Sequence, residues 1–208
     1  MQDDLNLTPP PQLNQIEAAT AIAGFTLASD RLTGALLRTL AATKPGGKLL
    51  ELGTGSGLST AWILDGMSAD ATLDTVDNDA KIQAIAKTHL GNDARLTIHT
   101  QDGDSFIRSL TAAQKHFDFI FADTWPGKLR LLEETLALLN AGGLYIVDDM
   151  LPQPNWTTLD LGYDHPAAIR SLTATLEALL DFHVTKLSWA TGIIIATRRA
   201  AWPLNHSH

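Results

Sequence analysis

The sequence predicts an α/β protein with a doubly wound, mostly parallel sheet of seven strands that ends in an antiparallel hairpin. Five short apolar segments alternate with segments of helical periodicity, and such alternation is typical of parallel strands joined by crossover helices. One more helix follows, and then two strands separated only by Ala190-Thr191. Because so short a link cannot cross the sheet, these two strands are expected to pair antiparallel.

The first 44 residues carry helical rather than strand patterns. Pro9-Pro10-Pro11 favours an extended lead-in, and a helix is expected over residues 12–27. Ser29-Asp30 is an N-cap signal for a second helix with a stripe of leucines, which ends before Pro45.

The sheet is expected from residue 48 onward. The predicted strands cover residues 48–52, 72–77, 95–100, 117–123, 143–149, 182–189 and 192–197. The predicted helices between them cover residues 58–67, 80–90, 105–110, 129–139 and 166–180. Residues 150–164 show no clear period, and a loop of that length in a compact domain is often a lid or a binding loop.

A glycine-rich loop connects the first predicted strand to the next helix, in the stretch Glu51-Leu-Gly-Thr-Gly-Ser-Gly57. Such a turn leaves backbone N–H groups facing a crevice, and its glycines let a ligand approach the backbone closely. The spacing is G-x-G-x-G, and Leu58 stands where a dinucleotide-binding loop would need its third glycine. A carboxylate at Glu51, near the crevice, favours a ligand with positive charge. The loop therefore predicts a cationic nucleoside rather than a nicotinamide dinucleotide.

Acidic residues stand at or just after the ends of the predicted parallel strands. They are Glu51, Asp77, Asp102, Asp123 and Asp148. In open parallel sheets, ligands bind beyond the carboxyl ends of the strands. Crowding carboxylates at one edge is unfavourable, so a cationic ligand or a bound metal is expected among them. Asp77 lies 24 residues after Gly53, close to the spacing at which a carboxylate binds ribose hydroxyls.

The glycine loop resembles the first motif of class I S-adenosylmethionine (SAM) methyltransferases, whose ligand carries a sulfonium and an ammonium group. Residues 48–198 resemble the catechol and caffeoyl-CoA type of metal-dependent O-methyltransferase. The motifs that carry this resemblance are Glu51-Leu-Gly-Thr-Gly, Thr75-Val-Asp77, Phe119-Ile-Phe-Ala-Asp123-Thr-Trp125 and Gly143-Leu-Tyr-Ile-Val-Asp148-Asp149. The resemblance implies the Rossmann-like class I methyltransferase fold, SAM as cofactor, and methyl transfer to a hydroxyl of a small molecule.

The resemblance also implies a set of cofactor-binding residues. They are Glu51, Gly53, Thr54, Gly55, Gly57, Ser59, Asp77, Asn78, Asp102, Gly103, Asp104, Asp123 and Trp125. In that family the acid after the second strand holds the ribose hydroxyls, which points to Asp77. The loop after the third strand flanks the adenine, and the tryptophan after the fourth strand packs near it. The alternative for Trp125 is a buried core side chain.

The metal ligands that the resemblance implies are Asp123, Asp148 and Asp149. The family has asparagine where this chain has Asp149, and a second carboxylate still suits Mg²⁺ or Ca²⁺. The family often has a lysine three residues after the strand-four acid as proton acceptor, but here that position is Pro126. Lys128 could reach the site only if the Pro-Gly turn redirects it. Asp123 and Lys128 are therefore the catalytic candidates.

Three alternatives stay open. The first is a methyltransferase without metal that acts on nitrogen or oxygen, in which an aspartate, Lys128 or His165 takes the proton. His165 precedes Pro166 at a predicted helix start, so a surface position is the competing interpretation. The second is a SAM-binding module without catalysis. The third, a nicotinamide oxidoreductase, is disfavoured by Leu58.

The composition of the chain limits the classes of partner that it is expected to bind. A net charge of −8 argues against broad binding to nucleic acid or an anionic membrane. No apolar stretch is long enough to span a bilayer, and the acidic start is unlike a signal peptide. We expect a single cytoplasmic domain with a small hydroxylated acceptor, covered by residues 1–44 and the loop 150–164. The resemblance implies that a homodimer is possible.

Overall fold

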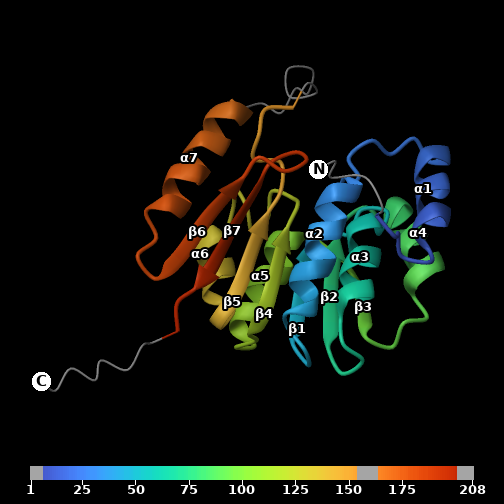
Figure 1. Ribbon diagram of the computed structural model, residues 1–208, viewed down its shortest axis with the longest axis horizontal. Helices are drawn as coiled ribbons and strands as arrows, with labels where there is room; N and C mark the ends of the chain where they lie inside the picture. Colours follow the sequence, from blue (N-terminus) through green and yellow to red (C-terminus); the bar gives the residue numbers. More distant parts are fainter. Residues whose placement is uncertain (1–6, 154–163, 201–208) are drawn as a thin grey trace, which may run out of the picture.

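The computed structural model describes residues 7–153 and 164–200, which form a seven-stranded sheet between two layers of helices (Figure 1). The strands are β1 (Lys48–Leu52), β2 (Thr72–Asp77), β3 (Leu96–Thr100), β4 (Phe117–Ala122), β5 (Leu139–Val147), β6 (Phe182–Leu187) and β7 (Ile193–Arg198). Their order is β3-β2-β1-β4-β5-β7-β6. The first five strands pair in parallel, and β7 lies antiparallel between β5 and β6. The predicted fold class is confirmed.

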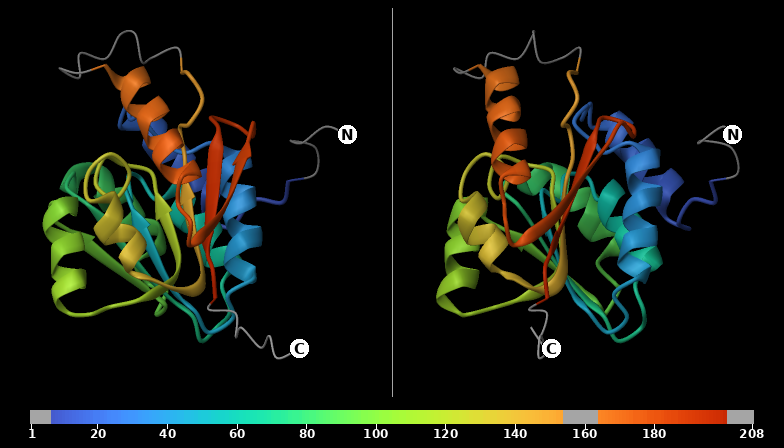
Figure 2. Two further views of the ribbon diagram at one scale, coloured as in Figure 1. Left: turned by 90° about the vertical axis from the view of Figure 1, so that its left-hand side faces the viewer. Right: turned by 60° about the vertical axis from the view of Figure 1, so that its left-hand side comes forward.

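The helices divide between the two faces of the sheet (Figure 2). They are α1 (Leu13–Ile22), α2 (Arg31–Ala42), α3 (Leu58–Gly66), α4 (Ala80–Leu90), α5 (Gly103–Ala112), α6 (Leu132–Ala137) and α7 (His165–Glu177). One apolar cluster joins the sheet to α1–α4, and a second joins it to α5–α7. Leu49 belongs to the first cluster and its neighbour Leu50 to the second, because side chains alternate along a strand.

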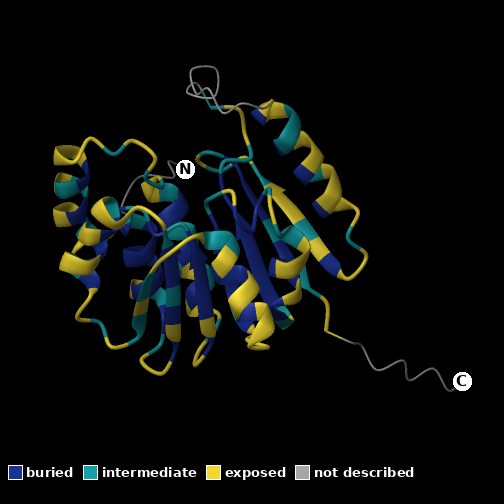
Figure 3. Cartoon of the chain, turned by 180° about the vertical axis from the view of Figure 1, so that it is seen from behind, coloured by how far each residue is buried: buried dark blue, intermediate teal, exposed yellow. Residues whose placement is uncertain are grey.

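Burial on both faces explains the near-continuous apolar strands that the sequence shows. Phe119, Ile120, Phe121 and Ala122 of β4 are all fully buried. In Figure 3 the central strands are dark blue, while the outer faces of the helices are largely exposed. Among the helices of the described residues, none combines the length and the apolar character needed to cross a bilayer.

Aspartates begin four of the helices. Asp30, Asp79, Asp102 and Asp164 each accept a backbone N–H from the first turn of α2, α4, α5 and α7, respectively. These bonds satisfy helix donors that have no partner within the helix. The predicted cap at Asp30 is confirmed.

Several predicted boundaries are wrong. The first helix ends at Ile22 rather than near residue 27, because Gly24 turns the chain out with φ of 68°. Leu129 precedes α6 instead of belonging to it, and β5 begins at Leu139 rather than Gly143. The early start of β5 includes an irregularity in its pairing with β4, where the register shifts between Phe117 and Phe119.

The final hairpin has a longer link than predicted, because β6 ends at Leu187 and β7 begins at Ile193. Ala190 and Gly192 both have positive φ in this turn. Trp189 donates its indole N–H to the carbonyl of Leu32, 2.8 Å away, which ties the turn to α2. Within the predicted loop 150–164, residues 154–163 lie outside the described residues.

Candidate functional site

A cavity of about 270 Å³ lies beyond the carboxyl ends of β1, β2, β4 and β5. It stands where the strand order reverses, between β1 and β4, which is where ligands bind in sheets of this kind. Most of the site residues predicted from the sequence line it. These are Gly53, Thr54, Gly55, Ser59, Asp77, Asn78, Asp123, Trp125, Lys128 and Asp149.

The glycine loop and Asp77 build one wall of the cavity together. The Asp77 carboxylate accepts the backbone N–H of Gly55 at 2.8 Å with one oxygen and that of Asp79 at 2.9 Å with the other. Each oxygen keeps a second lone pair that could accept a hydroxyl from a ligand. Gly53 has φ of 105°, and a Cβ there would lie 3.0 Å from the backbone oxygen of Asp123. The loop therefore needs glycine at position 53 to pass close to β4.

Glu51 does not face the cavity, contrary to the prediction that its carboxylate would contact the ligand. Its side chain is 0% exposed. It accepts hydroxyl hydrogen bonds from Ser59 (2.6 Å), Thr60 (2.5 Å) and Thr75 (2.6 Å). Burial raises the pKa of the Glu51 carboxyl to about 7, although these three bonds act in the opposite direction. Glu51 is thus an internal anchor for the start of α3.

Hydrogen bonds connect Glu51 to the cavity wall indirectly. The hydroxyls of Thr75 and Thr54 lie 2.7 Å apart, and the Gln83 amide donates to the Thr54 hydroxyl at 3.1 Å. When Glu51 is ionised, Thr75 donates to it, so Thr54 must donate to Thr75. Each residue in the series Gln83, Thr54, Thr75 then donates its hydrogen bond to the next, and Glu51 is the final acceptor. Thr54 is the member of this chain that lines the cavity.

Three aspartates lie at the ends of β4 and β5. Asp123 accepts the Ser29 hydroxyl at 2.8 Å. Burial, and then the charges of Asp148 and Asp149, raise the pKa of Asp123 well above its ordinary value. Asp148 is 2% exposed, and burial raises its pKa to about 6. One oxygen of Asp148 accepts both the Thr191 hydroxyl (2.5 Å) and the backbone N–H of Asp149 (2.7 Å).

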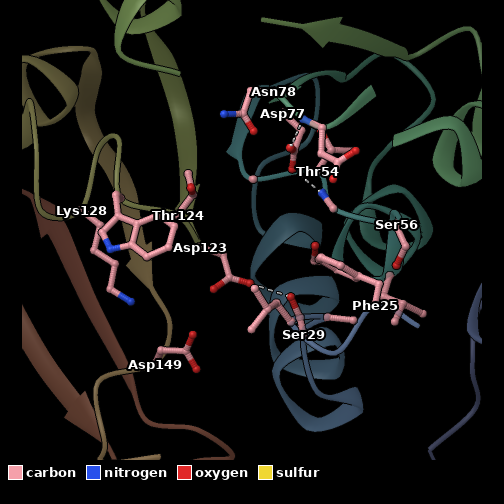
Figure 4. Close-up of a pocket in the computed structure, with 18 of the residues that line it drawn as sticks. Phe25, Ser29, Thr54, Ser56, Asp77, Asn78, Asp123, Thr124, Lys128 and Asp149 are labelled. Carbon is pink, nitrogen blue, oxygen red and sulfur yellow. Dashed lines mark hydrogen bonds between the residues drawn. The ribbon is translucent and has the colours of Figure 1, made fainter. Parts of the chain in front are cut away.

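A compact turn brings Lys128 into the same space. The backbone N–H groups of residues 128, 129 and 130 all donate to the carbonyl of Trp125, and Tyr145 donates its hydroxyl to the carbonyl of Gly127 at 2.7 Å. The Lys128 side chain is 6% exposed, and its Nζ donates to the backbone carbonyl of Asp148 at 2.7 Å. Figure 4 shows Lys128, Asp123 and Asp149 pointing toward one another. The Pro-Gly turn does redirect the lysine inward.

Comparisons with known proteins agree with this geometry. Residues 50–150, which run from the glycine loop to just past Asp149, match a family model described as a methyltransferase domain. The O-methyltransferase from Bacillus cereus, solved in complex with SAH, has 22% identity and a TM-score of 0.80, covering 95% of this chain and 94% of its own. The chain has the class I methyltransferase fold.

Two further proteins are similar to this chain. The O-methyltransferase TomG from Streptomyces achromogenes, solved with SAM, has 20% identity and a TM-score of 0.80, covering 95% of this chain and 94% of its own. A Mycolicibacterium smegmatis protein named "Putative O-methyltransferase" is 32% identical over 119 residues, which are 55% of this chain and 56% of that protein. The chain thus spans about half the length of the curated relatives it matches.

Some of the predicted site residues do not line the cavity and have other contacts. Asp102 caps α5, and Asp104 accepts the Arg130 guanidinium at 2.8 Å. Gly103 lies against Pro126, where a Cβ would come within 2.8 Å of the proline ring. The loop predicted to flank adenine therefore supports the turn that carries Trp125, which itself lines the cavity and is 38% exposed.

Gly57 packs helix α3 against α4, since a Cβ at this glycine would lie 2.7 Å from Cβ of Ala86. Its φ of 93° is in the left-handed region, so it serves the shape of the loop and the packing behind it. Ser59 lines the cavity, but its hydroxyl donates to Glu51.

Part of the cavity lining was not predicted from the sequence. The connection between α1 and α2 contributes Phe25, Leu27, Ala28 and Ser29. This segment is irregular and largely apolar, and no sequence pattern indicates that such a segment lines a cavity. The sequence did predict that helices within residues 1–44 would lie beside the acceptor. The surface interpretation of His165 is wrong, because it lines the cavity and is 9% exposed. Burial, and then the charge of Lys128, lower the pKa of His165.

The residues predicted to hold a metal do not fit one in this arrangement. Within residues 7–153 and 164–200, no three acidic or histidine side chains are placed to hold a metal ion. Mg²⁺ and Ca²⁺ take six or more oxygen ligands, several of them from carboxylates or water. Asp148 instead turns one oxygen to Thr191, and the Lys128 side chain reaches the carbonyl of Asp148.

Proposed function

We propose that the chain is a SAM-dependent O-methyltransferase that moves a methyl group from SAM to a hydroxyl of a small molecule. One observation supports this most strongly: the cavity at the β1–β4 switch point combines the backbone of the glycine loop with the Asp77 carboxylate. The methyltransferase fold and the SAM and SAH complexes of similar structures agree with it.

The wall formed by the glycine loop would hold the proposed cofactor. The remaining lone pairs of Asp77 would accept its ribose hydroxyls, and Asn78 lines the cavity next to Asp77 in the chain. Trp125, at the other side of the cavity, offers an aromatic surface for the adenine. Three carboxylates line the cavity, and their negative charge favours binding of the positively charged sulfonium. They are Asp77, Asp123 and Asp149. A dinucleotide, with its negative pyrophosphate, would be disfavoured by the same charges.

The proposed acceptor enters between the α1–α2 connection and α7. Phe25 and Leu27 give this side an apolar surface, and Asp123 and His165 supply polar groups. We propose, as the sequence predicts, that the chain forms one domain whose N-terminal helices cover the acceptor. Methyl transfer is an in-line displacement, so holding the acceptor oxygen opposite the sulfur supplies much of the rate enhancement.

In the reaction, a bond forms between the acceptor oxygen and the methyl carbon while the carbon–sulfur bond breaks. The electron pair of that bond stays on sulfur, and the hydroxyl proton must go to a base. We assign the base to Asp123, because its carboxylate lines the cavity beside Lys128 and is held by the Ser29 hydroxyl. His165, which also lines the cavity, is the alternative base.

Calorimetric titration with SAM and SAH, followed by transfer of a labelled methyl group to a panel of phenols and catechols, tests the proposal. Asp77→Asn removes one acceptor oxygen and the charge, and a hydrogen bond to a charged group contributes about 1.5–3 kcal/mol, so SAM affinity should fall about 10- to 100-fold. Asp181→Asn, at an exposed position before β6, is the matched control and should bind normally. If the wild-type protein binds neither SAM nor SAH, the proposal is wrong.

The same assays separate the remaining alternatives. Binding of SAM without turnover across the whole panel would indicate a binding module, and transfer to amines instead of hydroxyls would indicate an N-methyltransferase. A homodimer and a cytoplasmic location remain predictions from the sequence. Sedimentation equilibrium tests the first, and cell fractionation tests the second.

A further inference from the structure

At the ends of β4 and β5, the cavity is lined by two carboxylates, Asp123 and Asp149, and by the ammonium group of Lys128, and the carboxylate of Asp148 is buried nearby. We infer that Lys128 supplies the positive charge that a divalent metal would supply at Asp123, Asp148 and Asp149, and that its ammonium binds the acceptor oxygen directly. This inference rests on the proposed function and names how the acceptor is held.

Two of the three carboxylates already have partners within the protein. Asp148 shares one oxygen between the Thr191 hydroxyl and the backbone N–H of Asp149. Asp123 accepts the Ser29 hydroxyl. Each of these bonds uses one oxygen of its carboxylate, and a metal ion would still have to draw the three side chains into one coordination sphere. In the described part of the chain, no such set of ligands is formed.

Lys128 is placed to do what the metal would do. Its side chain is 6% exposed, and a buried ammonium is stable only where it has hydrogen bonds and opposite charge nearby. The carbonyl of Asp148 takes one of its three N–H donors. Asp123 and Asp149, toward which the side chain points, supply the opposite charge (Figure 4). Since Lys128 also lines the cavity, its other donors are available to a bound acceptor.

This arrangement has a consequence for the acceptor. A divalent ion can bind both oxygens of a vicinal diol, whereas an ammonium group needs only one oxygen and carries a single charge. An ammonium stabilises a phenolate but provides less help for an ordinary alcohol. We therefore expect a phenolic acceptor, and a single hydroxyl should serve as well as the paired hydroxyls of a catechol.

The first experiment uses the wild-type protein and needs no variant. EDTA treatment should leave both SAM affinity and methyl transfer within twofold of their starting values, with monophenols and catechols methylated at similar rates. Electron paramagnetic resonance of added Mn²⁺, with SAM present, should show the ion free in solution. Stoichiometric Mn²⁺ binding, or loss of activity in EDTA with recovery in Mg²⁺, would overturn the inference. Absence of SAM binding would refute the proposed function instead.

The second experiment tests the lysine itself. Removing one hydrogen-bond donor that stabilises a developing oxyanion reduces kcat by about 100- to 1,000-fold. Lys128→Met should show a loss of that size with SAM affinity changed less than about threefold, and Lys128→Arg should recover part of it. Lys115→Met, at the opposite end of β4, is the matched control. Near-wild-type turnover in Lys128→Met would overturn the inference, and if that variant does not fold, the Mn²⁺ measurement decides.

Discussion

Replacement of Glu51 by glutamine gives the clearest test of how the glycine loop is anchored. The Glu51 carboxyl is 0% exposed, and its pKa in the folded protein is about 7 against an ordinary value of 4.5. Because the folded pKa is raised, ionisation favours the unfolded chain, so stability falls as pH rises from 4.5 to 7. Glutamine does not ionise and removes this dependence.

The size of the effect follows from linkage. With about 1.4 kcal/mol for each pH unit of difference in pKa, Glu51 lowers the free energy of unfolding by about 1 kcal/mol at pH 5 and by about 3 kcal/mol at pH 8. The stability of Glu51→Gln relative to wild type should therefore rise by about 2–3 kcal/mol between these two pH values. Glu51→Gln should also change the free energy of unfolding by an amount that is the same at both pH values. The reason is that the glutamine NH₂ group donates hydrogen bonds, whereas the Glu51 oxygen accepted them from Thr60 and Thr75.

Urea unfolding followed by tryptophan fluorescence at pH 5 and pH 8 measures this difference. Glu134→Gln, at an exposed position in α6, is the control and should show little change between the two pH values. A difference below about 0.5 kcal/mol for Glu51→Gln would show that Glu51 does not titrate near neutrality. The reasoning about its burial would then be refuted.

Two further substitutions test the elements around the cavity. Gly57→Ala places a methyl group 2.7 Å from Ala86 at a φ of 93°, and should lower the free energy of unfolding by about 2–4 kcal/mol in urea. Gly142→Ala, with φ of 77° and no atom within 4 Å, should lower it by only about 1–2 kcal/mol, and equal losses would contradict the packing argument. Tyr145→Phe leaves the carbonyl of Gly127 without its 2.7 Å hydrogen bond. It should reduce stability by about 1 kcal/mol and reduce kcat more than SAM affinity, which steady-state kinetics and calorimetry would detect.

The sequence predicts the local features of this protein well because they depend on neighbouring residues. The glycines after β1 require a tight turn, and the caps at Asp30 and Asp79 need only the first residues of their helices. Acids at the ends of parallel strands meet at one edge of the sheet once the strands are parallel. These signals predicted the fold and the location of the cavity.

The tertiary structure decides the directions of side chains, because those depend on contacts far apart in the chain. Both faces of β1 are buried, so its pattern could not show that Glu51 turns toward Ser59 and Thr75 and does not line the cavity. Lys128 points inward only because the turn from Trp125 to Arg130 closes on itself and is bonded to Tyr145. Whether the three aspartates face a metal or a lysine is therefore a property of the packed fold rather than of the motif.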